Sequence, residues 1–263
     1  MSLRTFTIIV LLHTLPAIFT GCASEKPVVS TGVKNAQAIE DMGRSLVRQG
    51  DLRGGLAYLQ EAAQLKPEDP DLNHELALVY RDLNQYDLSL QYFHKALSLR
   101  PRFPEAQNNL GTLYLLTKKW DLAIECFRNA ISDLLYKTPD IAYNNMGLAY
   151  YNKGDYEKAI ESYRKALEEF PGYAACHANL GLAYEAMKKW EEAIESYKRA
   201  IQYAPDNPPP YLRLGQIYYI QKRMDDASEV LKKFLSLVKE GPEAEEAKKI
   251  LEKIESAGTE ETS

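Results

Sequence analysis

The sequence contains few of the residue types that build catalytic or metal centres. Only three cysteines and four histidines occur among its 263 residues. No two of His74, His94 and His177 are four residues apart, and the common zinc, paired-cysteine, serine-nucleophile and phosphate-loop motifs are missing from the sequence. We therefore predict a protein that is not an enzyme and that uses neither a metal nor another cofactor.

The charge balance gives no electrostatic reason to expect a nucleic-acid partner. Lys and Arg total 32 against 37 Asp and Glu, so the formal net charge is -5. The basic pairs are short and scattered along the chain, whereas nucleic-acid binding needs a basic patch or stripe. No nucleic-acid partner is predicted.

What the sequence does have is a repeat. The tyrosines at positions 80, 114, 150, 184 and 218 are separated by 34, 36, 34 and 34 residues. A small residue precedes each of them by three positions, and alanines and prolines recur in similar steps. A fixed period of this length indicates one supersecondary unit used many times. The small residues are Ala77, Gly111, Gly147, Gly181 and Gly215.

The pattern resembles the tetratricopeptide repeat, a helix–turn–helix unit of about 34 residues. The resemblance implies an all-α fold, a right-handed α-solenoid whose first helices line a concave groove. A charged segment at 242–257 is predicted to be a helix that caps the open end, and 258–263 a flexible tail. The six predicted copies are 36–69, 70–103, 104–139, 140–173, 174–207 and 208–241.

Two cysteines fall inside these copies, and neither is expected to form a disulfide. Cys126 is in the third copy and Cys176 in the fifth. A solenoid unit contacts only its neighbours, so the two Cα atoms should lie further apart than the roughly 7 Å that a disulfide spans. Both are predicted to be small buried hydrophobic residues.

The first 21 residues are organised like a secretory signal. Arg4 provides a basic start, and no Asp, Glu, Lys or Arg follows until Glu25. The segment between them is apolar and ends in small residues, which is typical of a cleaved signal peptide. The alternative is an uncleaved membrane helix, since about 20 residues can span a bilayer. His13, Pro16 and four threonines in this segment disfavour that alternative.

Small residues directly before Cys22 resemble the lipobox of bacterial lipoproteins. In that family the cysteine thiol accepts a diacylglycerol before the signal is removed. The resemblance implies a lipidated linker at 22–35. Several acyl chains would hold the protein at a membrane permanently, because each buried CH₂ contributes about 0.8 kcal/mol. Ala23 is not the aspartate that retains such proteins in the inner membrane. The implied location is the inner leaflet of the outer membrane, facing the periplasm.

A binding surface can be read from the first helix of each copy. In related repeats its second, fifth, ninth and twelfth residues face the groove. These positions are polar and of mixed charge in the first two copies and become apolar toward the C-terminus, which marks an interaction surface. We predict that a protein partner binds there through an extended or amphipathic apolar peptide. The alternative is that the C-terminal helix covers the surface. The predicted binding residues are Leu115, Ile141, Asn144, Leu148, Tyr151, Ala178, Leu182, Leu212, Gln216 and Tyr219.

The joint between the third and fourth copies is longer than the others, because the period becomes 36 residues and the proline expected at position 135 to end the helix comes late, at Pro139. Here Leu135-Tyr136, Pro139 and Asn145-Met146-Gly147 resemble the "LY…P…NLG" pattern of type IV pilus pilotin lipoproteins. Together with the lipobox, this resemblance implies a protein that escorts a secretin subunit to the outer membrane and promotes its assembly into a ring. Two alternatives stay open. One is a general periplasmic adaptor for another envelope or exopolysaccharide machine, and the other is an enzyme with a fused regulatory solenoid, for which the repeats leave little room.

Overall fold

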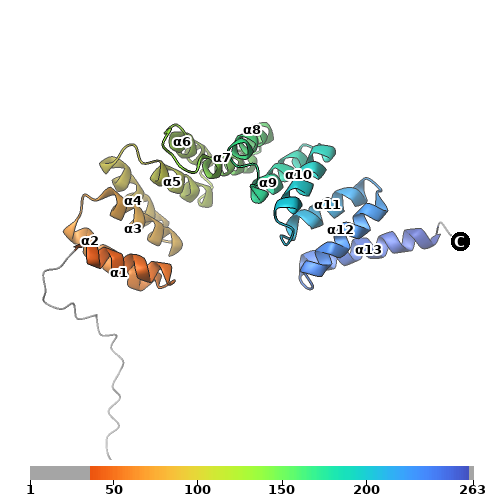
Figure 1. The fold of residues 1–263 in the computed structure, drawn as a ribbon, viewed down its shortest axis with the longest axis horizontal. Coiled ribbons are helices and arrows are strands. Elements are labelled where there is room, and N and C mark those ends of the chain that lie inside the picture. The colour runs from red at the N-terminus through yellow and green to blue at the C-terminus, as the bar shows by residue number, and fades with distance from the viewer. Residues whose placement is uncertain (1–35, 261–263) are drawn as a thin grey trace, which may run out of the picture. The chain divides into compact units, whose positions relative to one another are not determined.

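The computed structural model describes residues 36–260, with side chains to residue 256, and this part of the chain folds into thirteen α-helices without a strand (Figure 1). The predicted signal and linker lie outside the described residues. The helices are α1 (Ala36–Arg48), α2 (Leu52–Leu65), α3 (Pro70–Asp82), α4 (Tyr86–Leu99), α5 (Pro104–Leu116), α6 (Trp120–Ile131), α7 (Pro139–Lys153), α8 (Tyr156–Glu169), α9 (Ala174–Ala186), α10 (Trp190–Tyr203), α11 (Pro209–Ile220), α12 (Met224–Leu237) and α13 (Pro242–Glu260).

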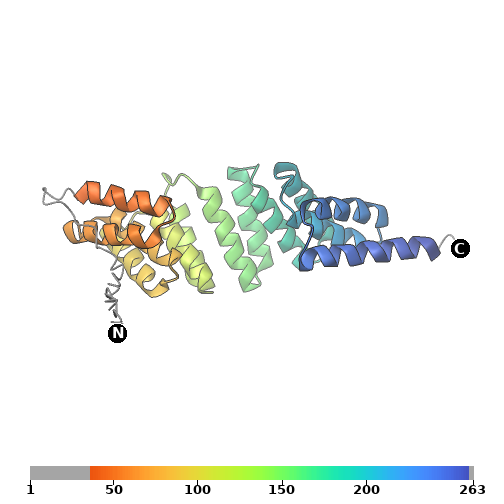
Figure 2. The ribbon, with the colours of Figure 1, turned by 90° about the horizontal axis from the view of Figure 1, so that it is seen from below.

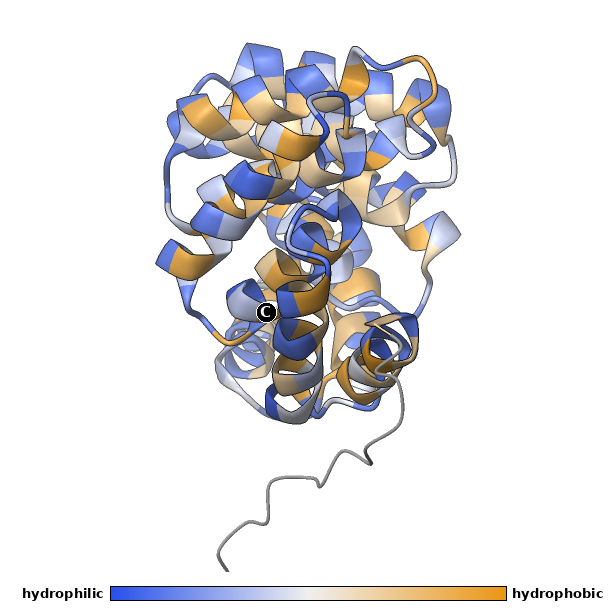
Figure 3. Ribbon diagram, turned by 90° about the vertical axis from the view of Figure 1, so that its left-hand side faces the viewer, coloured by the Kyte–Doolittle hydropathy of each residue, from blue (hydrophilic) through white to orange (hydrophobic). Residues whose placement is uncertain are grey.

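The helices are packed in sequential pairs. Each odd-numbered helix packs against the even-numbered helix that follows it, and that helix packs against the next odd-numbered one. Figures 1 and 2 show the pairs following one another from α1 to α13. Figure 3 shows hydrophobic and hydrophilic residues alternating around the helices, which lets each helix bury one face against its neighbours. The all-α solenoid implied by the resemblance to the tetratricopeptide repeat is confirmed.

Helix starts follow from proline and aspartate. A proline is the first residue of five helices, where its missing N–H costs no hydrogen bond. Asp51, Asp69 and Asp155 accept backbone N–H bonds at the starts of α2, α3 and α8. The five prolines are Pro70, Pro104, Pro139, Pro209 and Pro242.

The joint between α6 and α7 departs from the expected pattern. Elsewhere, as after α4, α8 and α10, a proline follows two residues behind the last helical residue. Pro139 is not a delayed stop of this kind, because it is the first residue of α7. The fourth unit therefore starts at Pro139, whereas the prediction had assigned this residue to the end of the third copy (104–139). Residues 132–138 form a loop that lacks the usual stop.

The turn within each pair contains one residue in the left-handed region. Its φ is 87° at Gly50 and 86° at Gly154, and between 57° and 60° at the four equivalent positions. Glycine adopts this conformation freely, whereas other residues lose roughly 1 kcal/mol or more there. The four non-glycine residues are Asn84, Lys118, Lys188 and Lys222. Three of these turns therefore place a lysine in a strained backbone conformation.

The two helices of a pair approach closely because a glycine faces a large side chain. A Cβ added to Gly181 would lie 2.6 Å from ring atom Cε1 of Tyr197, and one added to Gly147 would lie 2.5 Å from Cε1 of Tyr163. Both rings are about 1% exposed. At these two positions the small residue of the period therefore makes room for an aromatic ring of its own pair, and at Gly215 it makes room for Leu231.

α13 closes the C-terminal end. It packs along α12 and against α11, and its Ala244 and Ala247 are fully buried. Ile250 and Leu251 join the apolar cluster that this end of the solenoid shares. The predicted end at residue 257 is three residues too early, since the helix continues to Glu260 and takes in the start of the predicted tail.

Candidate protein-binding surface

The predicted binding surface lies on the odd-numbered helices of the six pairs, here called the A row (α1, α3, α5, α7, α9 and α11). Within this row α3 contacts α5, α5 contacts α7, and α7 contacts α9. Equivalent side chains of successive units therefore come together along the row, as the resemblance to the repeat family implied. The two halves of the row differ in chemistry.

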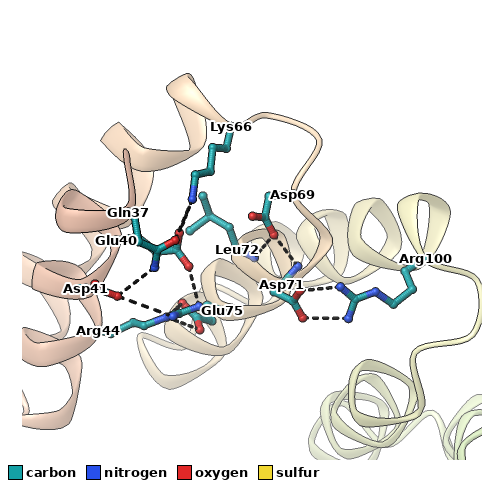
Figure 4. Close-up of polar contacts among 10 residues, drawn as sticks. All are labelled: Gln37, Glu40, Asp41, Arg44, Lys66, Asp69, Asp71, Leu72, Glu75 and Arg100. Atoms are coloured by element: carbon teal, nitrogen blue, oxygen red, sulfur yellow. Dashed lines mark hydrogen bonds and ion pairs between the residues drawn. The ribbon is translucent and has the colours of Figure 1, made fainter. Parts of the chain in front are cut away.

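Ion pairs occupy the first part of the row. The Glu40 side chain is buried, and its carboxylate accepts from Arg44 Nη2 at 2.5 Å and from Lys66 Nζ at 3.1 Å. Arg44 Nε also donates to Glu75 Oε1 on α3 at 2.7 Å (Figure 4). One guanidinium thus ties α1 to α3, and a buried carboxylate ties α1 to the end of α2. Charge-assisted bonds of this kind are the strong ones.

A second pair continues this network. Arg100 Nη1, just after α4, donates to Asp71 Oδ1 on α3 at 2.9 Å (Figure 4). The hydrogen bond from Arg100 lowers the pKa of Asp71. Burial raises the pKa of Glu75, and the bond from Arg44 opposes that rise. The charged residues predicted to face the groove in the first two units are therefore largely paired with one another, and few of them are left unpaired to bind a ligand.

His74 lies at the next step of the row and is held as a neutral acceptor. Burial lowers its pKa to about 4, and Asn109 Nδ2 on α5 donates to His74 Nε2 at 2.9 Å. Its ring meets Phe103 edge-on with the centroids 5.0 Å apart. Packing and an inter-unit hydrogen bond account for this histidine.

Asparagine amides bridge successive units further along the row. Asn145 Nδ2 donates to Asn108 Oδ1 at 3.5 Å, and Asn179 Nδ2 donates to Asn144 Oδ1 at 3.0 Å. The Asn-Asn pairs at 108–109 and 144–145 were a sequence signal for these bridges, which were not predicted. Asn144, one of the predicted binding residues, is only 5% exposed, so its amide holds α7 to α9.

The structure distributes the other predicted binding residues over a range of burial. Ile141 is the most open, at 37% exposed, whereas Leu212 is buried at 7%. The remaining ones are half-buried: Leu115, Leu148, Tyr151, Ala178, Leu182, Gln216 and Tyr219. Four of these, at positions 148, 151, 182 and 219, pack against the core cluster of the C-terminal units. They form a shallow apolar strip whose inner side belongs to the core.

The terminal helix reaches the end of this strip. Gln216 Nε2 on α11 donates to Glu246 Oε1 on α13 at 2.7 Å, and α13 packs against α11. The half-buried side chains of α7 and α9 remain partly open to solvent with α13 in place. The accessible part of the predicted surface is therefore centred on α7 and α9.

The described residues offer no arrangement for metal or thiol chemistry. No group of three or more His, Cys, Asp or Glu side chains in residues 36–256 could hold a metal ion. Cys126 and Cys176 are free and buried, and burial raises the pKa of each thiol to about 12, so both stay protonated at neutral pH. Cys22 lies outside the described residues. Among the helices described, none combines the length and apolarity that a membrane span requires.

Family comparison agrees with this architecture. Three family profiles, each described as a tetratricopeptide repeat, match the chain at residues 40–81 and 74–140, 139–206, and 186–248. Together they span the six helix pairs and reach into α13. No curated protein matches the chain by sequence.

Solved structures share the fold at low sequence identity. The structure of PilW, a "widely conserved type IV pilus biogenesis factor", has a TM-score of 0.73 and 20% identity over 81% of this chain and 97% of that chain. Pseudomonas aeruginosa PilF has a TM-score of 0.71 and 19% identity over 80% and 95%. YrrB, "a TPR protein with an unusual peptide-binding site", has a TM-score of 0.58 and 18% identity over 73% and 97%. Profiles and fold agree, and the chain is a tetratricopeptide-repeat protein.

Proposed function

We propose that this protein is a lipid-anchored adaptor that acts as a pilotin: it binds a secretin subunit along the A row and supports assembly of the type IV pilus secretin in the outer membrane. The solenoid contributes binding rather than catalysis. Cys22 carries the acyl chains, and these hold the protein at the inner leaflet, facing the periplasm.

One observation carries the pilus assignment. The helix pairs superimpose on nearly the whole of PilW, whose role is in type IV pilus biogenesis. The longer α6–α7 joint adds to it, because that joint carries the residues that resemble the pilotin pattern. The shallow apolar strip on α7 and α9 favours an apolar peptide segment of the partner.

A second candidate is a general periplasmic adaptor that serves another envelope or exopolysaccharide machine. The bridging asparagines and the apolar strip are as suitable for such a client as for a secretin. The similarity to YrrB, a peptide-binding repeat protein, is compatible with either role.

Deleting the gene separates the two candidates. If the protein is a pilotin, heat- and detergent-resistant secretin multimers disappear from outer-membrane fractions while secretin monomer remains. Wild type restores the multimers. Normal multimers in the deletion strain would reject the pilotin role and leave the adaptor.

The lipid anchor has its own test. Cys22→Ser removes the thiol that accepts the diacylglycerol, so the chain should leave the outer-membrane fraction and fail to restore multimers. Membrane retention equal to that of wild type would contradict the anchor. Labelling with a radioactive fatty acid reports acylation directly and does not depend on secretin.

A further inference from the structure

The loop at the α6–α7 joint exposes two leucines almost completely. Leu134 is 99% exposed and Leu135 is 86% exposed, whereas the other large apolar side chains described as exposed do not exceed 61%. Burying a leucine removes a large apolar area from water. A pair left this open has no structural role within its own chain.

The loop is held in this shape. Asp133 Oδ1 accepts from Leu135 N at 2.9 Å, and Tyr136 N donates to Asp133 O at 3.1 Å. Tyr136 is 8% exposed and packs with Ala130 and Ala142. A buried anchor on one side and an aspartate turn on the other fix the backbone, so presenting the leucines requires little further ordering.

The leucines lie on one particular edge of the solenoid. Even-numbered helices end and odd-numbered helices begin at the loops that join successive pairs, here called the joint edge. The exposed apolar side chains Leu65, Phe170 and Tyr203 also lie at or next to the ends of even-numbered helices, at 46%, 51% and 44% exposed. Leu116 and Ile220 lie singly on the opposite edge, at 55% and 61% exposed. α1 begins at this edge with Ala36. The chain that carries the proposed lipid therefore enters the solenoid on the edge that displays these side chains.

The charges and the tether suit a membrane. Arg102 and Lys137 are exposed beside the leucines, and cations near a surface are attracted to anionic lipids. Of the nearby acids, Asp133 accepts the hydrogen bond from Leu135 N. Glu105 and Asp140 lie by Tyr136, where they help to raise its pKa after burial, the main cause. The 14 residues from Cys22 to Ala36 reach up to about 45 Å when extended. The loop lies three helix pairs from the start of α1, which at roughly 10 Å for each pair is about 30 Å. The tether is therefore long enough for the lipid and the loop to reach the same bilayer.

We propose that Leu134 and Leu135 insert into the bilayer that holds the lipid anchor, so that the α6–α7 loop is a second membrane contact. This inference rests on the proposed anchor. Two leucines expose far less than the roughly 800 Å² that each side of a stable protein interface buries. A deformable lipid surface accepts so small a protrusion, and the acyl tether supplies most of the affinity.

A fluorophore placed on the loop tests the contact. Leu134→Cys in the full-length acylated chain provides one reactive thiol, because Cys22 is acylated and the other two cysteines are buried. The probe is nitrobenzoxadiazole, and the vesicles are phosphatidylethanolamine with phosphatidylglycerol, some carrying nitroxide-labelled acyl chains. The matched control is Leu116→Cys, 55% exposed at the end of α5 on the opposite edge.

We expect the probe at position 134 to shift to the blue, brighten several-fold and be quenched by the nitroxide, while the probe at 116 does none of these. If the chain sediments with vesicles but both probes stay in water, the contact is wrong and the anchor stands. A probe at 134 that changes only when a protein partner is added would also overturn it, in favour of a protein site. Failure to sediment with vesicles would reject contact and anchor together.

Discussion

At the scale of single residues, the stability of the fold depends on a few positions where adding a single atom would disturb the packing or the charge. The glycines of the period are such positions, because a large buried side chain fills the space where their own side chain would be: an aromatic ring at Gly111, Gly147 and Gly181, and Leu231 at Gly215. His74 is another, because it is half-buried as the neutral ring and protonation there would cost stability. Each leads to a measurable consequence for stability.

Gly181→Ala should destabilise the protein. Alanine is the better helix former by up to about 1 kcal/mol, but its Cβ would lie 2.6 Å from the buried ring of Tyr197, and overpacking costs typically 1–3 kcal/mol. We expect a net loss of about 1 kcal/mol, read from the midpoint of urea unfolding. Gly172→Ala is the control, since its Cβ would meet neighbours at 3.5 Å or more. Equal midpoints for the two variants would contradict the packing account.

Acid should weaken the N-terminal units through His74. Its pKa is lowered from the ordinary 6.5 to about 4 in the folded chain, so as pH falls through this window the unfolded chain takes up the proton first. The stability from this site is present above about pH 6.5 and lost toward pH 4, on the order of 3 kcal/mol.

His74→Gln tests that window. The variant loses the contact with Phe103 and starts less stable, but its free energy of unfolding should depend less on pH between 6.5 and 4. The comparison is between the pH slopes of the two proteins. Identical slopes would show that His74 does not carry the dependence.

At the scale of helices and turns, the ladder of left-handed turns contains removable strain. Lys188 has φ of 57° where Gly154 has 86°. Lys188→Gly relieves a cost of roughly 1–2 kcal/mol and adds back about 0.5–1 kcal/mol of glycine entropy, so we expect a gain of up to about 1 kcal/mol. Gly154→Ala is the converse change and should lower stability by about 1 kcal/mol. The midpoints of thermal unfolding of the two variants test this prediction. Midpoints that shift in the same direction relative to wild type would contradict it.

The helices and turns also show where sequence reasoning works and where it stops. The repeat period was sufficient for six pairs, and the charged segment at 242–257 was sufficient for a terminal helix. Pro139 was misjudged because proline serves equally after a helix and as its first residue. Gly258 predicts an end to α13, yet the helix continues past it to Glu260.

The candidate surface was harder to predict than the helices. Repeat positions place Asn144 on the A row, but its hydrogen-bond donor is Asn179, 35 residues later. The same holds for Arg44 and Glu75, which lie 31 residues apart and meet at 2.7 Å. Such partners depend on the rotation between successive pairs, which a single sequence does not specify. Repeat positions were sufficient to assign residues to the A row, but they did not give the exposure of each side chain.

At the scale of the whole molecule, the strip on α7 and α9 should be the partner's site. Leu148→Glu combined with Leu182→Glu places two charges on it. We expect capture of the proposed secretin partner to be at least about tenfold weaker, since anchor residues each contribute more than about 1 kcal/mol. Both leucines are half-buried, so far-UV circular dichroism must stay unchanged for the result to count. Leu122→Glu, exposed on α6, is the matched control. Capture by the double variant equal to that of the control would argue against this site.

The arrangement in which each helix pair contacts only its neighbours has an evolutionary consequence. Duplicating or deleting one unit of 34 residues lengthens or shortens the solenoid without disturbing distant units. The α6–α7 loop is the exception, because its two extra residues and its leucines belong to one joint. A unit gained or lost elsewhere would therefore leave the contacts of that loop unchanged, and the loop would remain a fixed point from which the units of the solenoid can be counted.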